Sequence, residues 1–325
     1  MGQRFTFYLD WLPNVQFAGI CWALDRGLYR KAGLDVTLVP WVEDGQSVVE
    51  MVVAGGLCAG SAEDNLIVAA RACGHAQVNA LAAMFQETPL VIMSRPESGI
   101  RTIADLRGKR VAMHCDGIRI LEGMLDFHGI CRGDLDLVEV AHDLENLPAR
   151  RFDAVQGYAV AEPLELAARG LTVSTFTLRH RKLHPYAQVI FAPDALLATH
   201  RRHYKRFLQA SFAGWRACLE NLDQAAASIR NVGAPMENQE QQFAALQLVC
   251  QLVSGRDTAG GIGCIDPERW AGNVRAYRGL GIVPPDTPLS CALDTSFWPS
   301  GSTAAAKGWK TGSPVAAETL SQETS

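Results

Sequence analysis

The sequence predicts an α/β protein built from two lobes. Short strand-like runs alternate with helical runs along most of the chain, an order typical of parallel strands layered with helices. At 325 residues the chain is long enough for two domains of roughly 100–200 residues, each with its own core. The runs form two successive series, one starting at the amino terminus and the other near Pro96.

The first series opens with an alternating strand-like run at residues 4–10 and a helical run at residues 16–32. In the helical run Ile20, Leu24 and Leu28 recur at helical spacing, and a glycine follows it as a stop signal. Further strands are expected at residues 34–40, 57–61, 78–85 and 90–94, with helices at residues 47–53 and 63–72.

The second series repeats this alternation and then gives way to long helices. Its strands are expected at residues 110–114, 135–140, 153–158, 171–176 and 187–192, and its helices at residues 102–106, 117–128 and 162–169. Three longer helices are expected at residues 201–231, 238–252 and 267–279.

This order predicts that the middle third of the chain is inserted into a lobe made from the first and last thirds. Lobe I is expected to comprise residues 1–93 and 190–298, and lobe II residues 94–189. The strands at 90–94 and 187–192 would cross between the lobes as a hinge. Residues 299–325 are rich in Ser, Thr, Ala and Gly, which predicts a disordered tail.

Composition excludes several classes of protein. A net charge of −4 provides no basic field for nucleic acid, and no apolar run approaches the ~18–20 residues that span a bilayer. The amino terminus lacks the apolar segment of a signal peptide, and the nine cysteines are an odd, scattered set without a disulfide or zinc pattern. We therefore expect a cytoplasmic protein as the chain stands, or a periplasmic one if a signal peptide has been removed.

Several segments resemble the NMT1/THI5-like family. They are LDWLPNVQFAG at residues 9–19, the run at residues 23–36, IADLRGKRV at residues 103–111, FDAVQGYAVAEPLEL at residues 152–166 and residues 186–191. The family includes periplasmic binding proteins for thiamine-precursor pyrimidines and is similar to sulfonate and riboflavin-precursor binders. The resemblance implies a periplasmic-binding-protein-like fold with a two-strand hinge and a ligand cleft between the lobes. For an exported protein it also implies an ABC permease as partner.

The same family contains a thiamine-pyrimidine synthase, an iron-dependent enzyme that uses a lysine-bound pyridoxal phosphate. At the positions that resemble its lysine and histidine this chain has Ala62 and Leu66, and Phe17 replaces a further histidine. Alanine cannot form a Schiff base and leucine cannot transfer a proton. We therefore expect no catalytic residues, no cofactor and no metal, while a divergent enzyme or a cytoplasmic sensor remains the alternative to a binding protein.

Candidate binding residues in lobe I follow the carboxyl ends of its strands. Trp11 offers a flat face and Asn14 an amide for a heterocycle, with Phe17 as a second stacking wall. The alternatives are a packing role for the two aromatic residues and helix capping by Asn14. The other lobe I candidates are Glu63 and Asp64, which open a helix where capping is the alternative, and Gln86 near the hinge.

Candidates in lobe II occupy the equivalent places. Cys115, Asp116 and Gly117 follow one strand. Cys115 is expected to form a thiol wall rather than act as a nucleophile, and for Asp116 the alternative is a helix cap. Tyr158 and Glu162 lie where the next strand ends and a helix begins. The resemblance implies that Glu162 accepts hydrogen bonds from an aminopyrimidine; the alternative is that it binds its own helix terminus. Tyr186 at the returning hinge strand completes the set.

These observations predict a protein that closes two lobes on one small heterocyclic ligand. A thiamine-precursor pyrimidine is the first candidate, with another heterocycle or a sulfonate behind it. A nucleic-acid partner and a position within the membrane are not expected.

Overall fold

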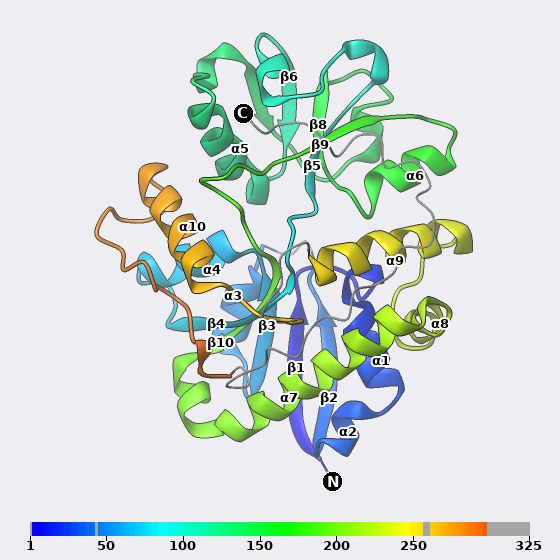
Figure 1. The fold of residues 1–325 in the computed structure, drawn as a ribbon, viewed down its shortest axis with the longest axis vertical. Helices are drawn as coiled ribbons and strands as arrows, with labels where there is room; N and C mark the ends of the chain where they lie inside the picture. The colour runs from blue at the N-terminus through cyan, green and yellow to red at the C-terminus, as the bar shows by residue number, and fades with distance from the viewer. Residues whose placement is uncertain (1, 43–44, 256–260, 298–325) are drawn as a thin grey trace.

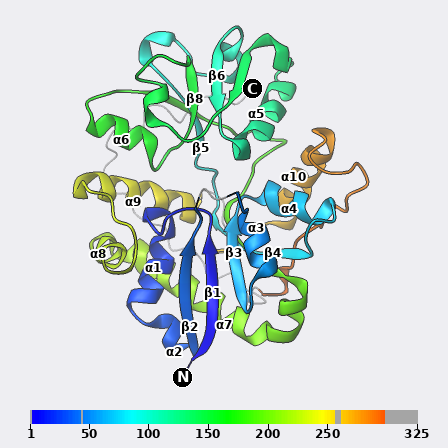
Figure 2. The same cartoon turned by 180° about the vertical axis from the view of Figure 1, so that it is seen from behind.

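The computed structural model describes residues 2–42, 45–255 and 261–297 of the chain. Its two five-stranded sheets belong to two lobes, one above the other in Figure 1 and seen from behind in Figure 2. The expected tail at residues 299–325 lies outside the described residues.

The first sheet lies in lobe I and has the order β2-β1-β3-β10-β4. Strand β1 is parallel to β2 and β3, whereas β10 runs antiparallel to β3 and β4. The bounds are β1 Gln3–Leu9, β2 Leu34–Pro40, β3 Cys58–Ala62, β4 Val78–Phe85 and β10 Ala187–Pro193.

The second sheet lies in lobe II and has the order β7-β6-β8-β5-β9. Strand β6 is parallel to β7 and β8, and β5 is antiparallel to β8 and β9. The bounds are β5 Leu90–Ser94, β6 Arg110–Met113, β7 Asp136–Glu139, β8 Ala154–Tyr158 and β9 Ser174–Thr177.

Most helices belong to lobe I. They are α1 Ala18–Asp25, α2 Leu28–Lys31, α3 Val48–Ala54, α4 Asp64–Ala72, α7 Asp194–Glu220, α8 Leu222–Val232, α9 Gln239–Ser254 and α10 Pro267–Gly279. Lobe II contains α5 Cys115–Phe127 and α6 Glu162–Ala168.

The two expected helices 16–32 and 201–231 are each divided in two. Gly27 has a left-handed backbone with φ 66°, which ends α1 and starts α2 in a new direction. Asn221 has an extended backbone and caps α8 by accepting a hydrogen bond from the N–H of Gln224. Residues with these backbone angles cannot continue an α-helix. The apolar spacing runs through both positions, and for this reason the breaks could not be predicted from it.

The strands expected to cross between the lobes each belong to a single sheet. Strand β5 pairs with β8 from Leu90 onward, so residues 90–93 join lobe II rather than lobe I. Strand β10 starts at Ala187 in the first sheet, so residues 187–189 join lobe I. The chain passes between the lobes in the segments just before these two strands, as both views show (Figures 1 and 2).

The lobe I core explains the alternation seen in the first strand. Phe5, Phe7 and Leu9 are buried on the face that meets α1 and α7, and Phe5 stacks on Phe207 at 4.6 Å between ring centroids. Helices α1 and α7 pack most closely where two glycines meet. A Cβ on Gly214 would lie 2.1 Å from the carbonyl oxygen of Gly19, so only glycine allows this approach.

Candidate ligand-binding site between the two lobes

The parallel strands of both sheets direct their carboxyl ends toward the space between the lobes. Residues that follow or end these strands contact one another across that space. In lobe I they are Trp11, Trp41 and Glu63, and in lobe II they are His114, His142 and Tyr158. Ligands of open α/β sheets bind beyond the carboxyl ends of the strands, so this is where a ligand is expected.

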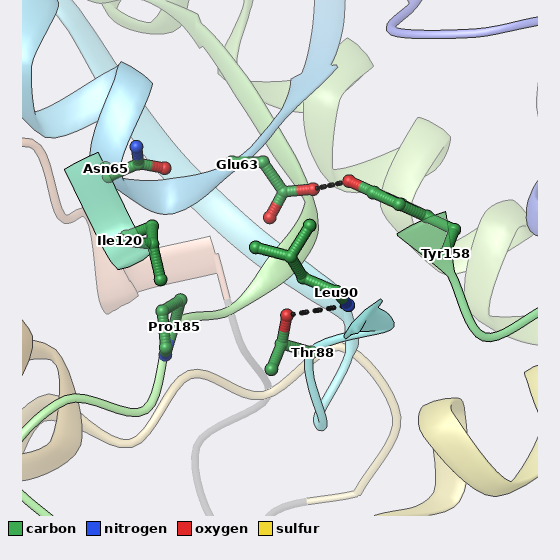
Figure 3. A pocket seen from close by; sticks show the side chains of 7 residues that line it. All are labelled: Glu63, Asn65, Thr88, Leu90, Ile120, Tyr158 and Pro185. Carbon is green, nitrogen blue, oxygen red and sulfur yellow. Dashed lines mark hydrogen bonds between the residues drawn. The ribbon is translucent and has the colours of Figure 1, made fainter. Parts of the chain in front are cut away.

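A narrow pocket opens between the lobes at this place (Figure 3). Its cavity volume is about 10 Å³, roughly the room for one water molecule, so the pocket is nearly closed in this structure. Its walls come from both lobes and from both connecting segments: Glu63, Asn65, Thr88, Leu90, Ile120, Tyr158 and Pro185.

One hydrogen bond joins the two lobes across the pocket. The hydroxyl of Tyr158 donates to Oε1 of Glu63 at 2.5 Å (Figure 3). Glu63 is in place because it is the N-cap residue of α4, directly after β3, while Tyr158 ends β8, where it pairs with Leu90 of β5. Both residues were expected in the site, and the structure brings them together.

A row of aromatic rings forms a second contact between the lobes. Trp11 stacks on Trp41 at 6.2 Å between ring centroids and meets the edge of His142 at 5.9 Å. His142 in turn lies 5.7 Å from the ring of His114. Trp11 is 36% exposed, so part of its indole remains accessible to solvent. Trp41 was missed by the sequence analysis, although it follows β2 as directly as Trp11 follows β1.

Glu162 is held within lobe II. Its Oε2 accepts a hydrogen bond from the N–H of Tyr158 at 2.7 Å, and its Oε1 lies 3.4 Å from Nδ1 of His142. Burial raises the pKa of Glu162 above its ordinary value, against these hydrogen bonds and the nearby imidazole. The carboxylate therefore stabilises the start of α6, which matches the alternative interpretation for this residue.

Asp64 points away from the pocket. Its carboxylate is fully buried and accepts hydrogen bonds from the hydroxyl of Tyr277, the amide of Asn273 and the N–H of Tyr186. Burial raises the pKa of Asp64, although these donors act in the opposite direction. With every oxygen engaged inside lobe I, Asp64 joins α4, β10 and α10 instead of contacting a ligand.

Tyr186 belongs to the same buried hydrogen-bond network as Asp64. Its ring lies under the guanidinium of Arg269 at 3.6 Å, and its hydroxyl accepts a hydrogen bond from the N–H of Asp266. Because the side chain is almost fully buried, the structure places it in the core rather than on the cleft wall.

Three further candidates have structural roles in lobe I. Phe17 is buried against Phe7, with ring centroids 6.5 Å apart. Asn14 caps the helical turn that precedes α1 by accepting from the N–H of Gln16. Gln86 is buried and donates to the carbonyl oxygens of Ala83 and Cys264. For Asn14 and Phe17 these positions match the capping and packing alternatives.

The candidates at the start of α5 are described only in part. The helix begins at Cys115, and the side chains of Cys115 and Asp116 lie outside the described residues. Gly117 is buried, and a Cβ there would lie 2.1 Å from the amide oxygen of Gln156. Gly117 therefore makes room for Gln156, which accepts from the N–H of His114, and not for a ligand.

A buried polar network below the cleft was not foreseen from the sequence. The amide of Gln188 donates to Asp10 and to Gln16, and accepts from the hydroxyl of Ser61. Gln188 has φ 52°, a left-handed conformation that is costly for a residue with a side chain. The strained residue thus ties the end of β1 to β3 and β10.

The described residues contain no group of three or more His, Cys, Asp or Glu side chains that could hold a metal ion. Within the same part of the chain, no helix is long and apolar enough to cross a membrane.

The chain matches the family model described as NMT1/THI5 like over residues 14–225. A riboflavin-binding protein, RibY, from Chloroflexus aurantiacus is 23% identical over 310 residues, which cover 92% of this chain and 87% of the relative.

Two solved structures show the same fold at low sequence identity. The periplasmic aliphatic sulphonate binding protein SsuA from Escherichia coli has a TM-score of 0.69 and 15% identity, over 90% of this chain and 98% of that one. The alkanesulfonate-binding protein SsuA from Xanthomonas axonopodis pv. citri, bound to MOPS, has a TM-score of 0.66 and 14% identity, over 90% and 98%. The chain therefore belongs to the NMT1/THI5-like family, and its fold is that of the periplasmic solute-binding proteins.

Proposed function

We propose that this protein captures one small, flat heterocycle with N–H donors between its lobes and releases it unchanged. A thiamine-precursor aminopyrimidine is the first candidate. The observation that supports this best is the hydrogen bond from Tyr158 to Glu63 across the pocket. It places an acceptor of lobe I opposite a polar group of lobe II, and a ring enters between them when this bond opens.

The charge of the pocket favours an aminopyrimidine over a sulfonate. Among the seven described residues that line it, Glu63 is the only charged type, and none is Lys or Arg. A sulfonate is permanently anionic and would lie beside this carboxylate without a cation to balance it. An aminopyrimidine instead presents N–H groups, which a carboxylate binds through charge-assisted hydrogen bonds.

The pocket is nearly closed in this structure, since its cavity volume of about 10 Å³ is roughly the room for one water molecule. A ligand therefore enters only when the lobes move apart, and the volume of this arrangement does not rank the candidate ligands. The relative named as riboflavin-binding takes a ligand whose ring system also contains a pyrimidine ring. Because this relative is only 23% identical to the chain, we rank riboflavin second.

In this proposal each lobe contributes distinct groups. Glu63 accepts from the ring, and Tyr158 turns its hydroxyl from Glu63 toward the ligand. Trp11 covers the ring or the mouth of the cleft with the accessible part of its indole. Glu162 acts through Tyr158, because it holds the N–H of that residue.

Binding, rather than conversion, is supported by Ala62 and Leu66, which stand where the resemblance places the lysine and histidine of the family's synthase. Ala62 is buried at the end of β3, and Leu66 is 41% exposed on α4. Neither side chain can act as a base or a nucleophile.

Isothermal titration calorimetry tests the proposal with three ligands: the thiamine-precursor aminopyrimidine, riboflavin and an alkanesulfonate. We expect the aminopyrimidine to bind, and Glu63→Gln to weaken it at least tenfold while leaving the sulfonate no weaker. The matched control is Glu240→Gln, since Glu240 is exposed in the first turn of α9. Mass spectrometry of the released ligand should return an unchanged mass. Binding of the sulfonate alone, or recovery of a converted ligand, contradicts the proposal.

We propose the cytoplasm as the compartment, because all eight cysteines in the described part of the chain are free. If the protein is exported, an ABC permease becomes the proposed partner. Cell fractionation separates the two cases: a periplasmic pool of the protein contradicts the cytoplasmic proposal.

A further inference from the structure

Asn65 is a buried polar residue that sequence reasoning did not select. It is the second residue of α4, it is 5% exposed, and its side chain lies on the wall of the pocket (Figure 3). Its side-chain amide makes no hydrogen bond with any described residue, although it carries one acceptor and two donors. Its two preceding neighbours are both engaged, Glu63 with Tyr158 and Asp64 with Tyr277.

Neither amide atom of Asn65 is among the fully buried side-chain atoms that lack a partner, so the amide keeps a small contact with solvent. An amide that is this little hydrated and has no protein partner still gives up part of its hydrogen bonding to water, which lowers the stability of the folded chain. A leucine at this position has a similar branched shape and no such cost. The position of Asn65 on a pocket wall provides the reason for an asparagine here: a ligand can supply the missing partner.

The surroundings of Asn65 define the ligand further. Leu90, Ile120 and Pro185 are buried and apolar, so they form walls suited to the faces of a ring. The hydroxyl of Thr88, also buried, accepts from the N–H of Leu90, which leaves its hydrogen available as a donor. The apolar walls therefore contact the faces of a bound ring, and the polar side chains contact its edges.

We propose that Asn65 is a specificity-determining residue that reads an amidine edge of the bound ring. An asparagine amide has a donor and an acceptor side by side, and the ring nitrogen and amino group of an aminopyrimidine match this pair. A sulfonate offers acceptors only, and would leave the amide oxygen of Asn65 without a donor. This inference rests on the proposed function and adds the group that distinguishes the ligand classes.

The first test is a thermodynamic cycle between ligand and protein. Titration calorimetry compares the thiamine-precursor aminopyrimidine with an analogue that lacks the amino group, on the wild type and on Asn65→Leu. We expect Asn65→Leu to bind the aminopyrimidine at least tenfold more weakly, and to show a smaller penalty for loss of the amino group than the wild type. Asn65→Asp should also weaken binding, because it removes the amide donors. The control Asn238→Asp keeps the cap of α9 and should leave affinity unchanged.

The second test uses the ligand-free protein. If Asn65 serves the ligand, thermal unfolding of Asn65→Leu should occur at the same temperature as the wild type or higher. A lower midpoint shows that the amide supports the fold, and overturns the inference whatever the ligand is. The inference is overturned, and the proposed function left intact, if wild type and Asn65→Leu bind the aminopyrimidine equally well. The same holds if loss of the ligand's amino group weakens binding to both proteins by the same factor. If the wild type binds none of the heterocycles, the proposed function fails and the inference fails with it.

Discussion

The hydrogen bond between Tyr158 and Glu63 makes a prediction about the conformation of the ligand-free protein. Tyr158→Phe removes the hydroxyl that donates to the Glu63 carboxylate at 2.5 Å and keeps the ring. Hydrogen bonds to charged groups contribute about 1.5–3 kcal/mol. Because both side chains are only partly buried, the lower value of about 1.5 kcal/mol applies. Since about 1.4 kcal/mol corresponds to a factor of ten, the ligand-free lobes should shift roughly tenfold toward the open arrangement.

Small-angle X-ray scattering measures this shift as an increase in the radius of gyration. We expect ligand-free Tyr158→Phe to be larger than the wild type and to contract to the same size when the aminopyrimidine is added. Tyr8→Phe is the matched control, since no described residue shares a hydrogen bond with the hydroxyl of Tyr8. Identical scattering of Tyr158→Phe and wild type without ligand, together with an unchanged urea midpoint, would refute a role for this bond in holding the lobes together.

Three more predictions concern the hinge, the core and the aromatic row. Burial alone would raise the pKa of Glu87, but the hydrogen bond with His184 and the nearby guanidinium groups hold it below its ordinary value. The stabilisation is therefore present above pH ~4.3 and is lost as pH falls through the lowered pKa. Glu87→Gln should cost about 1–2 kcal/mol at pH 7, and the difference in melting temperature should close below pH ~4; a constant difference contradicts this. Gly214→Ala should cost about 1–3 kcal/mol in urea unfolding, because its Cβ would collide with the Gly19 carbonyl. Gly272→Ala, with nothing within 4 Å of its Cβ in α10, should stabilise by about 0.5–1 kcal/mol, and equal effects of the two glycine changes would rule out the collision. Trp11→Ala should weaken aminopyrimidine binding about two- to tenfold by calorimetry, and an unchanged affinity would show that its ring does not contact the ligand.

The fold could be predicted in its main features because strand and helix periodicities are local. The alternation of Phe5, Phe7 and Leu9 marked the first strand, and the same residues form the core against α1 and α7. The break at Gly27 was missed because the apolar spacing runs through it. The lobe boundary was predicted a few residues too far along the chain, because the sequence of a strand such as β5 does not show which sheet it joins.

The strand ends that face the space between the lobes could be predicted from the sequence, but not the direction of each side chain there. The segment after β3 was identified as facing the cleft, yet its three residues Glu63, Asp64 and Asn65 have different fates. Glu63 reaches across the pocket, Asp64 turns into the core toward Tyr277, and Asn65 lies on the pocket wall. Successive side chains at the start of a helix point about 100° apart. Only the packing partners, supplied by α10 and by lobe II, decide which of them faces the pocket.

The same limit explains the candidates that proved to be buried. Phe17 and Tyr186 have the ring type expected of stacking residues. In the structure, Phe7 packs against Phe17 at a steep angle between the rings, and the guanidinium of Arg269 covers the ring of Tyr186. Trp41, in contrast, was available to the same reasoning as Trp11 and was overlooked.

The most direct measurement is a crystal structure of the protein with the thiamine-precursor aminopyrimidine bound. We expect the ring between the lobes, with its N–H groups within hydrogen-bond distance of Glu63, its amidine edge on Asn65, and the Glu63–Tyr158 bond replaced. A ring bound outside this pocket, or a pocket in which Glu63 and Tyr158 remain bonded while ligand is present, would contradict it.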